Sequence, residues 1–126
     1  MTEYFRLYNA IDLALDPFPY GGGTTTCDAL YMGVPVVSLK GRTAVGRAGV
    51  SILSNVGLQE LIAESPGEYV RIALDHDQNW HRLGELRSIL RQRMRASPIM
   101  NFAAFARNVE QQYRRMWQAW CDGHSL

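Results

Sequence analysis

The sequence has few cysteines, no long apolar run and almost no net charge, and each shortage excludes a class of protein. Its two cysteines, Cys27 and Cys121, lie too far apart for a disulfide framework or a metal-binding knuckle. No apolar run is long enough to cross a membrane, and the first residues lack the basic flank and apolar core of a signal peptide. We therefore expect a cytoplasmic protein, with residues 1–126 forming a single domain.

Lysine is the scarcest charged residue. Of the 13 basic residues only Lys40 is a lysine, which leaves twelve arginines, and the net charge of +1 attracts neither nucleic acid nor an anionic membrane. Arginine suits bidentate pairing with carboxylates and phosphates, although a GC-rich genome gives the same bias. Five arginines share one amphipathic segment without interleaved aromatic residues, which favours a solvated face over a nucleic-acid site. They are Arg82, Arg87, Arg91, Arg93 and Arg95.

Two short apolar segments, Ala10–Leu15 and Val34–Leu39, are typical of buried strands. A helix over Thr25–Gly33 joins them, which predicts a right-handed βαβ unit with parallel strands. A second helix is expected over 43–53. From there on the pattern is helical throughout, including a helical turn at 58–63.

The predicted fold class is therefore α/β, with a short parallel sheet followed by several helices. Residues 1–57 would form a βαβ nucleotide-binding portion, and residues 58–126 a helical portion. A Rossmann-like sheet usually has five or six strands, so we expect the C-terminal portion of such a domain. The remaining strands would lie elsewhere in a longer enzyme, or a partner or self-association would cover the sheet edges.

The stretch "FPYGGGTTTCDALYMGVPVV" follows the first predicted strand and is the clearest candidate site. Glycines at the carboxyl end of a parallel strand let the backbone approach an anion closely. The helix that follows presents unpaired N–H groups and the positive end of its dipole. Thr24, Thr25 and Thr26 add hydroxyl donors, and Asp28 can accept hydrogen bonds from ribose hydroxyls. The stretch thus predicts a pyrophosphate site that needs no metal.

The same residues also fit a purely structural role. Thr24 or Thr25 can cap the helix, with Asp28 interacting favourably with its dipole. Neither the Rossmann fingerprint nor the Walker pattern is matched. Asp16 is interpreted as a turn residue before Pro17 rather than as a catalytic acid.

Nearly the whole chain resembles the C-terminal end of the O-linked N-acetylglucosamine transferase / SPINDLY family. The resemblance rests on the run "IDLALDPFPYGGGTTTCDALYMGVPVVSLKGRTAVGRAGVSILSNVGLQELIAES" and on "RMRASPIMNFAAFARNVEQQYRRMW". It implies an inverting, metal-independent glycosyltransferase with the two Rossmann domains of the GT-B type, usually preceded by tetratricopeptide repeats. Such enzymes transfer a sugar from a nucleotide donor to Ser or Thr of an acceptor protein.

The resemblance also implies site residues. Gly22, Gly23, Thr24 and Thr25 would hold the donor pyrophosphate, and Asp28 the ribose. Animal members carry histidine at the position of Gly23, whereas bacterial-type relatives tolerate glycine. The family's first Rossmann domain, its essential phosphate-contacting lysine and its base-binding segment precede the matched region. We therefore identify no catalytic residue in this chain, and the variable position of Lys40 does not replace that lysine.

Other polar residues are weaker candidates. The family also has arginine at Arg47, which would contact the diphosphate or brace its loop, and Arg42 and Thr43 would line the same crevice. A cluster of metal-ligand types sits at a helix junction, where we expect no metal. It comprises Asp75, His76, Asp77 and His81.

The last amphipathic helix is rich in aromatic residues. In the family this helix crosses back onto the N-terminal domain, which implies that its aromatic face meets a partner. That face comprises Phe105, Tyr113, Trp117 and Trp120. The alternative is ordinary packing of Phe102, Phe105 and Val109 against the preceding helix.

The resulting hypothesis is the UDP-N-acetylglucosamine-like donor-binding part of a protein O-glycosyltransferase, inactive in isolation. Its partners would be a nucleotide sugar and an acceptor protein, with no cofactor, membrane or nucleic acid. The donor sugar would be N-acetylglucosamine or fucose. The alternative is a stand-alone, non-catalytic nucleotide-binding or protein-interaction module.

Overall fold

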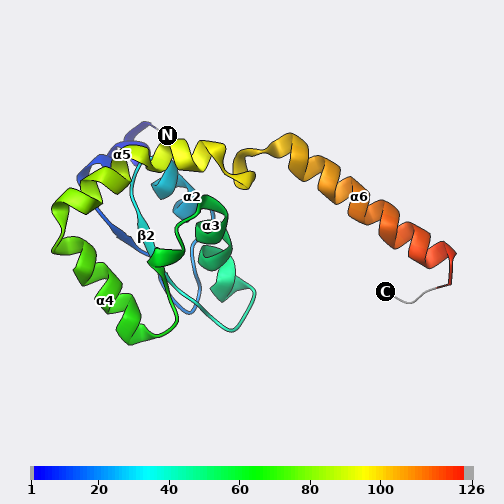
Figure 1. Ribbon diagram of the computed structural model, residues 1–126, viewed down its shortest axis with the longest axis horizontal. Helices are drawn as coiled ribbons and strands as arrows, with labels where there is room; N and C mark the ends of the chain where they lie inside the picture. The colour runs from blue at the N-terminus through cyan, green and yellow to red at the C-terminus, as the bar shows by residue number, and fades with distance from the viewer. Residues whose placement is uncertain (1, 124–126) are drawn as a thin grey trace.

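The computed structural model describes residues 2–123, which form a parallel sheet surrounded by helices (Figure 1). The strands lie in the order β1 (Ala14–Leu15), β2 (Val36–Leu39) and β3 (Ile62–Ala63). The α-helices are α1 (Thr2–Leu7), α2 (Thr24–Tyr31), α3 (Ala48–Val56), α4 (Pro66–Asp77), α5 (Trp80–Ala96) and α6 (Phe102–Cys121). Short 3-10 helices cover Tyr8–Ala10, Val45–Arg47, Gln59–Leu61 and Pro98–Met100.

The prediction of a helical turn at 58–63 is wrong. A 3-10 turn over Gln59–Leu61 leads into β3, which pairs in parallel with β2 through the partners Ser38 and Ile62. The backbone N–H of Lys40 extends this pairing by donating to the carbonyl oxygen of Ala63 at 2.9 Å. Only two residues long, β3 shows no alternation, so its pairing with a distant strand decides its structure.

Two other boundaries differ from the prediction. The first strand starts at Ala14 rather than Ala10, because a 3-10 turn occupies Tyr8–Ala10. The helix expected over 43–53 is a loop and a 3-10 turn followed by α3, which ends at Gly57 in the left-handed conformation with φ of 76°. The first βαβ unit is confirmed, with Ala14 paired to Val36 across parallel strands.

The hydrophobic core lies between the sheet and its covering helices. Helices α2 and α3 pack on β2 and on each other, and α4 packs on β2 and β3. Figure 1 shows α4 and α3 on opposite sides of β2. Fully buried side chains come from α2, the loop before β2, β2 itself, α3, α5 and the segment before β3: Leu30, Val34, Val37, Leu53, Leu58, Leu61 and Leu90.

The arginines of α5 attach that helix to the rest of the domain. Arg91 donates from Nε to the carbonyl oxygen of Tyr31 at 2.8 Å, and its guanidinium lies 5.1 Å from the centre of the Tyr31 ring. Arg87 forms an ion pair with Asp12, and Arg93 donates to the carbonyl oxygen of Gly57 at 3.4 Å. Arg91 and Arg93 remain exposed, as expected of a solvated face, but all three arginines also bind neighbouring segments.

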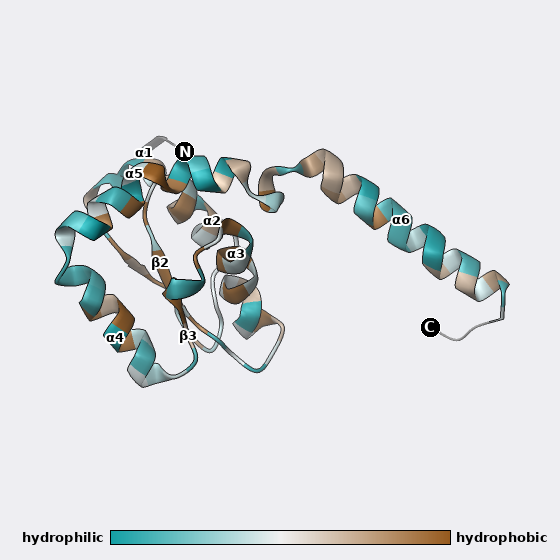
Figure 2. Cartoon of the chain, in the orientation of Figure 1, coloured by the Kyte–Doolittle hydropathy of each residue, from teal (hydrophilic) through white to brown (hydrophobic). Residues whose placement is uncertain are grey.

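Helix α6 leaves the compact part of the molecule at the corner formed by Pro98–Met100 and extends away from it (Figure 1). It buries no residue, and Figure 2 shows hydrophobic and hydrophilic residues interspersed along this free-standing helix. The alternative in which Phe102 and Phe105 pack against the preceding helix is wrong, because they are 69% and 68% exposed. Among residues 2–123, no helix is both long and apolar enough to cross a membrane.

Candidate functional site

The loops that follow β1 and β2 lie side by side at the carboxyl edge of the sheet. The space between them is a small cavity of about 130 Å³, lined by Pro17, Phe18, Pro19, Gly21, Leu39, Lys40, Gly41 and Gly46. The second loop is closed by a hydrogen bond from the N–H of Gly41 to the carbonyl oxygen of Gly46 at 2.8 Å. This is the edge at which open parallel sheets bind ligands.

The buried residue Asp16 holds this edge of the sheet together by hydrogen bonds. Its side chain is buried, and Oδ1 accepts a hydrogen bond from the N–H of Gly22 at 2.6 Å. Its Oδ2 accepts from the hydroxyl of Ser38 at 2.8 Å, and its carbonyl oxygen accepts from the hydroxyl of Tyr69 at 2.9 Å. Asp16 is therefore more than a simple turn residue, because it ties the glycine loop (residues 21–23) to β2 and α4.

Two glycines near Asp16 are required by close packing. A Cβ atom at Gly22 would lie 2.6 Å from the hydroxyl oxygen of Thr26 and 2.7 Å from that of Thr25. A Cβ atom at Gly49 would lie 2.6 Å from Oδ2 of Asp16. A Cβ atom at Gly23, in contrast, would have no neighbour within 4 Å. The backbone approaches its surroundings closely at Gly22, whereas Gly23 faces open space.

The start of α2 is an uncapped helix terminus. Its N-cap is Gly23, so the alternative in which Thr24 or Thr25 caps the helix is wrong. No described residue accepts a hydrogen bond from the backbone N–H groups of residues 23–26. At α4, α5 and α6, in contrast, a cap side chain accepts such a bond: Ser65, Asn79 and Asn101. The donors of α2 are therefore available to an anion.

The threonine hydroxyls and the Asp28 carboxylate of α2 differ in their exposure to solvent. Thr24 and Thr25 are exposed, whereas Thr26 is buried. Asp28 is half-buried one turn further along, on the same face as Thr24. Its Oδ2 accepts a hydrogen bond from the hydroxyl of Tyr4 at 3.1 Å, a contact that the sequence alone did not suggest. Burial, with a smaller effect of the Asp28 charge, raises the pKa of the neighbouring Cys27 thiol.

The arginine candidates lie on the second loop. Arg47 ends the 3-10 turn, where its backbone N–H donates to the carbonyl oxygen of Ala44 at 3.2 Å. Its exposed side chain has no hydrogen-bond or ion-pair partner within residues 2–123. Gly46, its neighbour, packs against the first loop, because a Cβ atom there would lie 3.2 Å from the carbonyl oxygen of Pro19. Thr43 shapes this loop by accepting from the N–H of Gly46 at 3.2 Å, and Arg42 is exposed.

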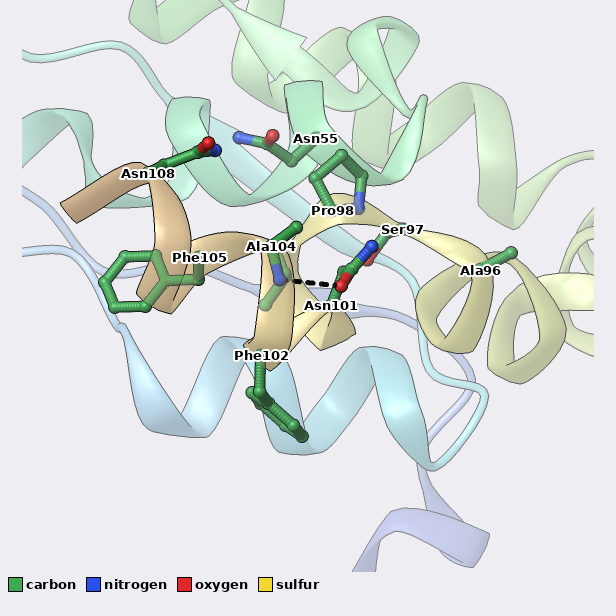
Figure 3. Close-up of a pocket in the computed structure, with 10 residues that line it drawn as sticks. Asn55, Ala96, Ser97, Pro98, Asn101, Phe102, Ala104, Phe105 and Asn108 are labelled. Atoms are coloured by element: carbon green, nitrogen blue, oxygen red, sulfur yellow. Dashed lines mark hydrogen bonds between the residues drawn. The ribbon is translucent and has the colours of Figure 1, made fainter. Parts of the chain in front are cut away.

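A larger cavity, of about 670 Å³, lies away from these loops. It is formed by the end of α3, the Pro98 corner and the first turns of α6, where Asn101 accepts from the N–H of Ala104 (Figure 3). None of its lining side chains is charged, so it offers no ionic partner for a phosphate. Nor do the described residues contain a group of three or more potential metal ligands, including around His76.

Residues 2–109 match glycosyl transferase family 41. The chain belongs to this family. A probable UDP-N-acetylglucosamine–peptide N-acetylglucosaminyltransferase SPINDLY from Hordeum vulgare is 45% identical over 98% of the chain, and its counterpart from Oryza sativa subsp. japonica is 46% identical over 96%. The chain spans only 13% of the length of either relative.

The fold of this family 41 chain also matches a solved structure. An O-GlcNAc transferase mutant from Thermobaculum terrenum superposes with a TM-score of 0.90 at 42% identity, over 98% of this chain and 24% of that one. The family resemblance and the α/β fold class predicted from the sequence are both confirmed. The division into portions 1–57 and 58–126 stays a prediction, although β3 lies in the portion expected to be helical.

Proposed function

We propose that this chain forms the donor-nucleotide side of a protein O-glycosyltransferase. One observation carries the proposal: the uncapped start of α2 faces a glycine loop held in place by the buried Asp16 carboxylate. The pyrophosphate of a UDP-sugar would accept hydrogen bonds at Gly22–Thr25, and Asp28 would accept from the ribose hydroxyls. The names of the plant relatives, which specify a UDP-N-acetylglucosamine donor and a peptide acceptor, support this substrate class.

The proposed chemistry assigns the leaving-group half of the reaction to this chain. A Ser or Thr hydroxyl attacks the anomeric carbon, the bond to the donor phosphate breaks, and negative charge grows on the departing nucleoside diphosphate. Fixed N–H groups and hydroxyls aimed at that charge stabilise the transition state, each by about 2–4 kcal/mol as for oxyanion-hole donors. The exposed Arg47, beside the same loop, would add a positive charge without any metal.

No general base is assigned to the described residues. We therefore propose that the isolated chain binds nucleotide but transfers no sugar, as a non-catalytic nucleotide-binding module also would. A sugar-transfer assay that compares the chain with a full-length relative distinguishes part of an enzyme from a non-catalytic module. Activity that appears only in the long protein and disappears with changes at Gly22 supports the enzyme.

The proposal is tested by titrating the chain with UDP, GDP and inorganic pyrophosphate while recording backbone NMR shifts. We expect shifts at residues 21–28 and at Arg47, unchanged by EDTA. Gly22→Val should abolish them, because its side chain would collide with the hydroxyls of Thr25 and Thr26. Gly84→Ala is the control outside the site, since a Cβ atom at that position in α5 meets open space, and it should keep the affinity of the unchanged chain. Equal binding by both variants would contradict the proposed phosphate site.

A further inference from the structure

We propose that Tyr4 is a positioning residue for Asp28: its hydroxyl occupies one carboxylate oxygen and directs the other toward the ribose hydroxyls of a bound nucleoside diphosphate. This inference rests on the proposed function, in which Asp28 binds the ribose. It adds a residue from α1, outside the glycine loop and outside every motif that the sequence suggests.

The donor and the acceptor can be assigned in both hydrogen bonds of the Tyr4 hydroxyl. The Tyr4 hydroxyl lies 3.1 Å from Oδ2 of Asp28 and 2.7 Å from the hydroxyl oxygen of Tyr8. A carboxylate only accepts, so the one proton of Tyr4 points to Asp28, and Tyr8 must donate to Tyr4. The chain of donors therefore runs from Tyr8 through Tyr4 to Asp28. Oδ1 of Asp28 has no partner among residues 2–123 and is left to accept from a ligand.

The surroundings of Tyr4 support a fixed geometry. Its ring meets those of Phe5 and Tyr8 edge-on, with centroids 5.1 Å and 5.4 Å away. The hydrogen bond with Tyr8, then desolvation and the bond to Asp28, raise the pKa of Tyr4 well above that of a free tyrosine. The hydroxyl is thus a proton donor at neutral pH.

The Tyr8 end of this chain of donors borders the candidate site. Tyr8 lines a cavity of about 140 Å³ together with Asp16, Pro17 and Thr25. The segment before β1 and the start of α2 therefore share one surface. A ligand whose phosphates lie at the start of α2 would have its ribose close to Asp28, one turn further along the helix.

The test compares two ligands and five proteins, the unchanged chain and four variants, by calorimetry or NMR titration. UDP carries the ribose, whereas inorganic pyrophosphate carries only the phosphates. The variants are Tyr4→Phe, Asp28→Ala and the double variant, with Tyr113→Phe on the exposed face of α6 as a matched control. Tyr4→Phe keeps the ring contacts, so circular dichroism and melting should match those of the unchanged chain.

We expect Tyr4→Phe to weaken UDP binding about five- to tenfold, which is within the effect of losing one ordinary hydrogen bond. Pyrophosphate binding should stay unchanged, which a general loosening of the loop would not allow. In the Asp28→Ala background, Tyr4→Phe should cause no further loss, because the two residues act as one unit.

The failures are distinguishable. If Asp28→Ala weakens UDP binding and Tyr4→Phe does not, the positioning role is overturned and the proposed function stands. If Tyr4→Phe weakens UDP and pyrophosphate equally, Tyr4 is only structural and the inference is again overturned. If neither variant changes UDP binding, or the unchanged chain binds no UDP, the proposed ribose site fails and the inference fails with it.

Discussion

Helices α5 and α6 both have apolar residues at helical spacing, but their surroundings are opposite. Helix α5 buries Leu83, Leu90 and Met94 against the domain, and its arginines bind neighbouring segments. Helix α6 buries no residue, and two of its tryptophans, Trp117 and Trp120, are 67% and 72% exposed. Periodicity therefore identifies the apolar face of each helix, but the availability of a packing partner decides whether that face contributes to stability.

The comparison is tested most strongly by truncating one large side chain in each helix. Leu90→Ala should lower the free energy of unfolding by about 2–5 kcal/mol, because it leaves a cavity in a fully buried position. Trp117→Ala removes a larger side chain but should change stability by less than about 0.5 kcal/mol, since that side chain is largely solvated. Urea denaturation followed by circular dichroism measures both. A large loss from Trp117→Ala would show that α6 has a packing partner in solution.

A second test extends the comparison from helices to single backbone positions. Gly49→Ala places a methyl group against Asp16 and Ser38 and should cost about 1–3 kcal/mol through overpacking. Gly84→Ala, in α5, meets open space and should stabilise the protein by about 0.5–1 kcal/mol through helix propensity. Thermal melting of the two variants shows whether each change raises or lowers the stability of the protein. If both variants were stabilised, the space between Gly49 and Asp16 would be large enough to accept a methyl group.

Local signals account for what the sequence predicts well. Ser65 caps α4 and Pro66 begins it, and both signals are local because the capping side chain and the fixed φ of proline act within one turn. The βαβ unit follows from two apolar segments and the glycines between them. The confirmed family likewise depends on motifs that remain contiguous in the chain.

Nonlocal contacts account for what the sequence does not predict. The pairing of β3 with β2, the bond from Tyr69 to Asp16 and the bond from Tyr4 to Asp28 join residues 24 to 53 positions apart. No periodicity or spacing rule marks such pairs. The glycine loop was recognisable as a candidate site, whereas the buried carboxylate that holds it became apparent only from its partners.

One of these nonlocal bonds should contribute only modestly to stability. Tyr69→Phe removes the hydroxyl that donates to the carbonyl oxygen of Asp16 and should cost about 1 kcal/mol at neutral pH. Burial, with a smaller effect of the Asp16 charge, raises the pKa of Tyr69 above its ordinary value of 10.0. The unfolded chain therefore loses this proton first, so the contribution of Tyr69 is complete below about pH 10 and falls as the pH rises further.

Urea denaturation at neutral pH and above pH 10 separates this contribution from other alkaline effects. Tyr69→Phe should be less stable than the unchanged chain at neutral pH, and the difference should shrink as the pH rises. Tyr113→Phe is the matched control, because its exposed ring on α6 contributes to no packed surface and should change neither value. A difference between the unchanged chain and Tyr69→Phe that stays constant with pH would mean that the hydroxyl is solvated. The Tyr69 hydroxyl would then contribute no more to stability than the exposed side chains of α6 do.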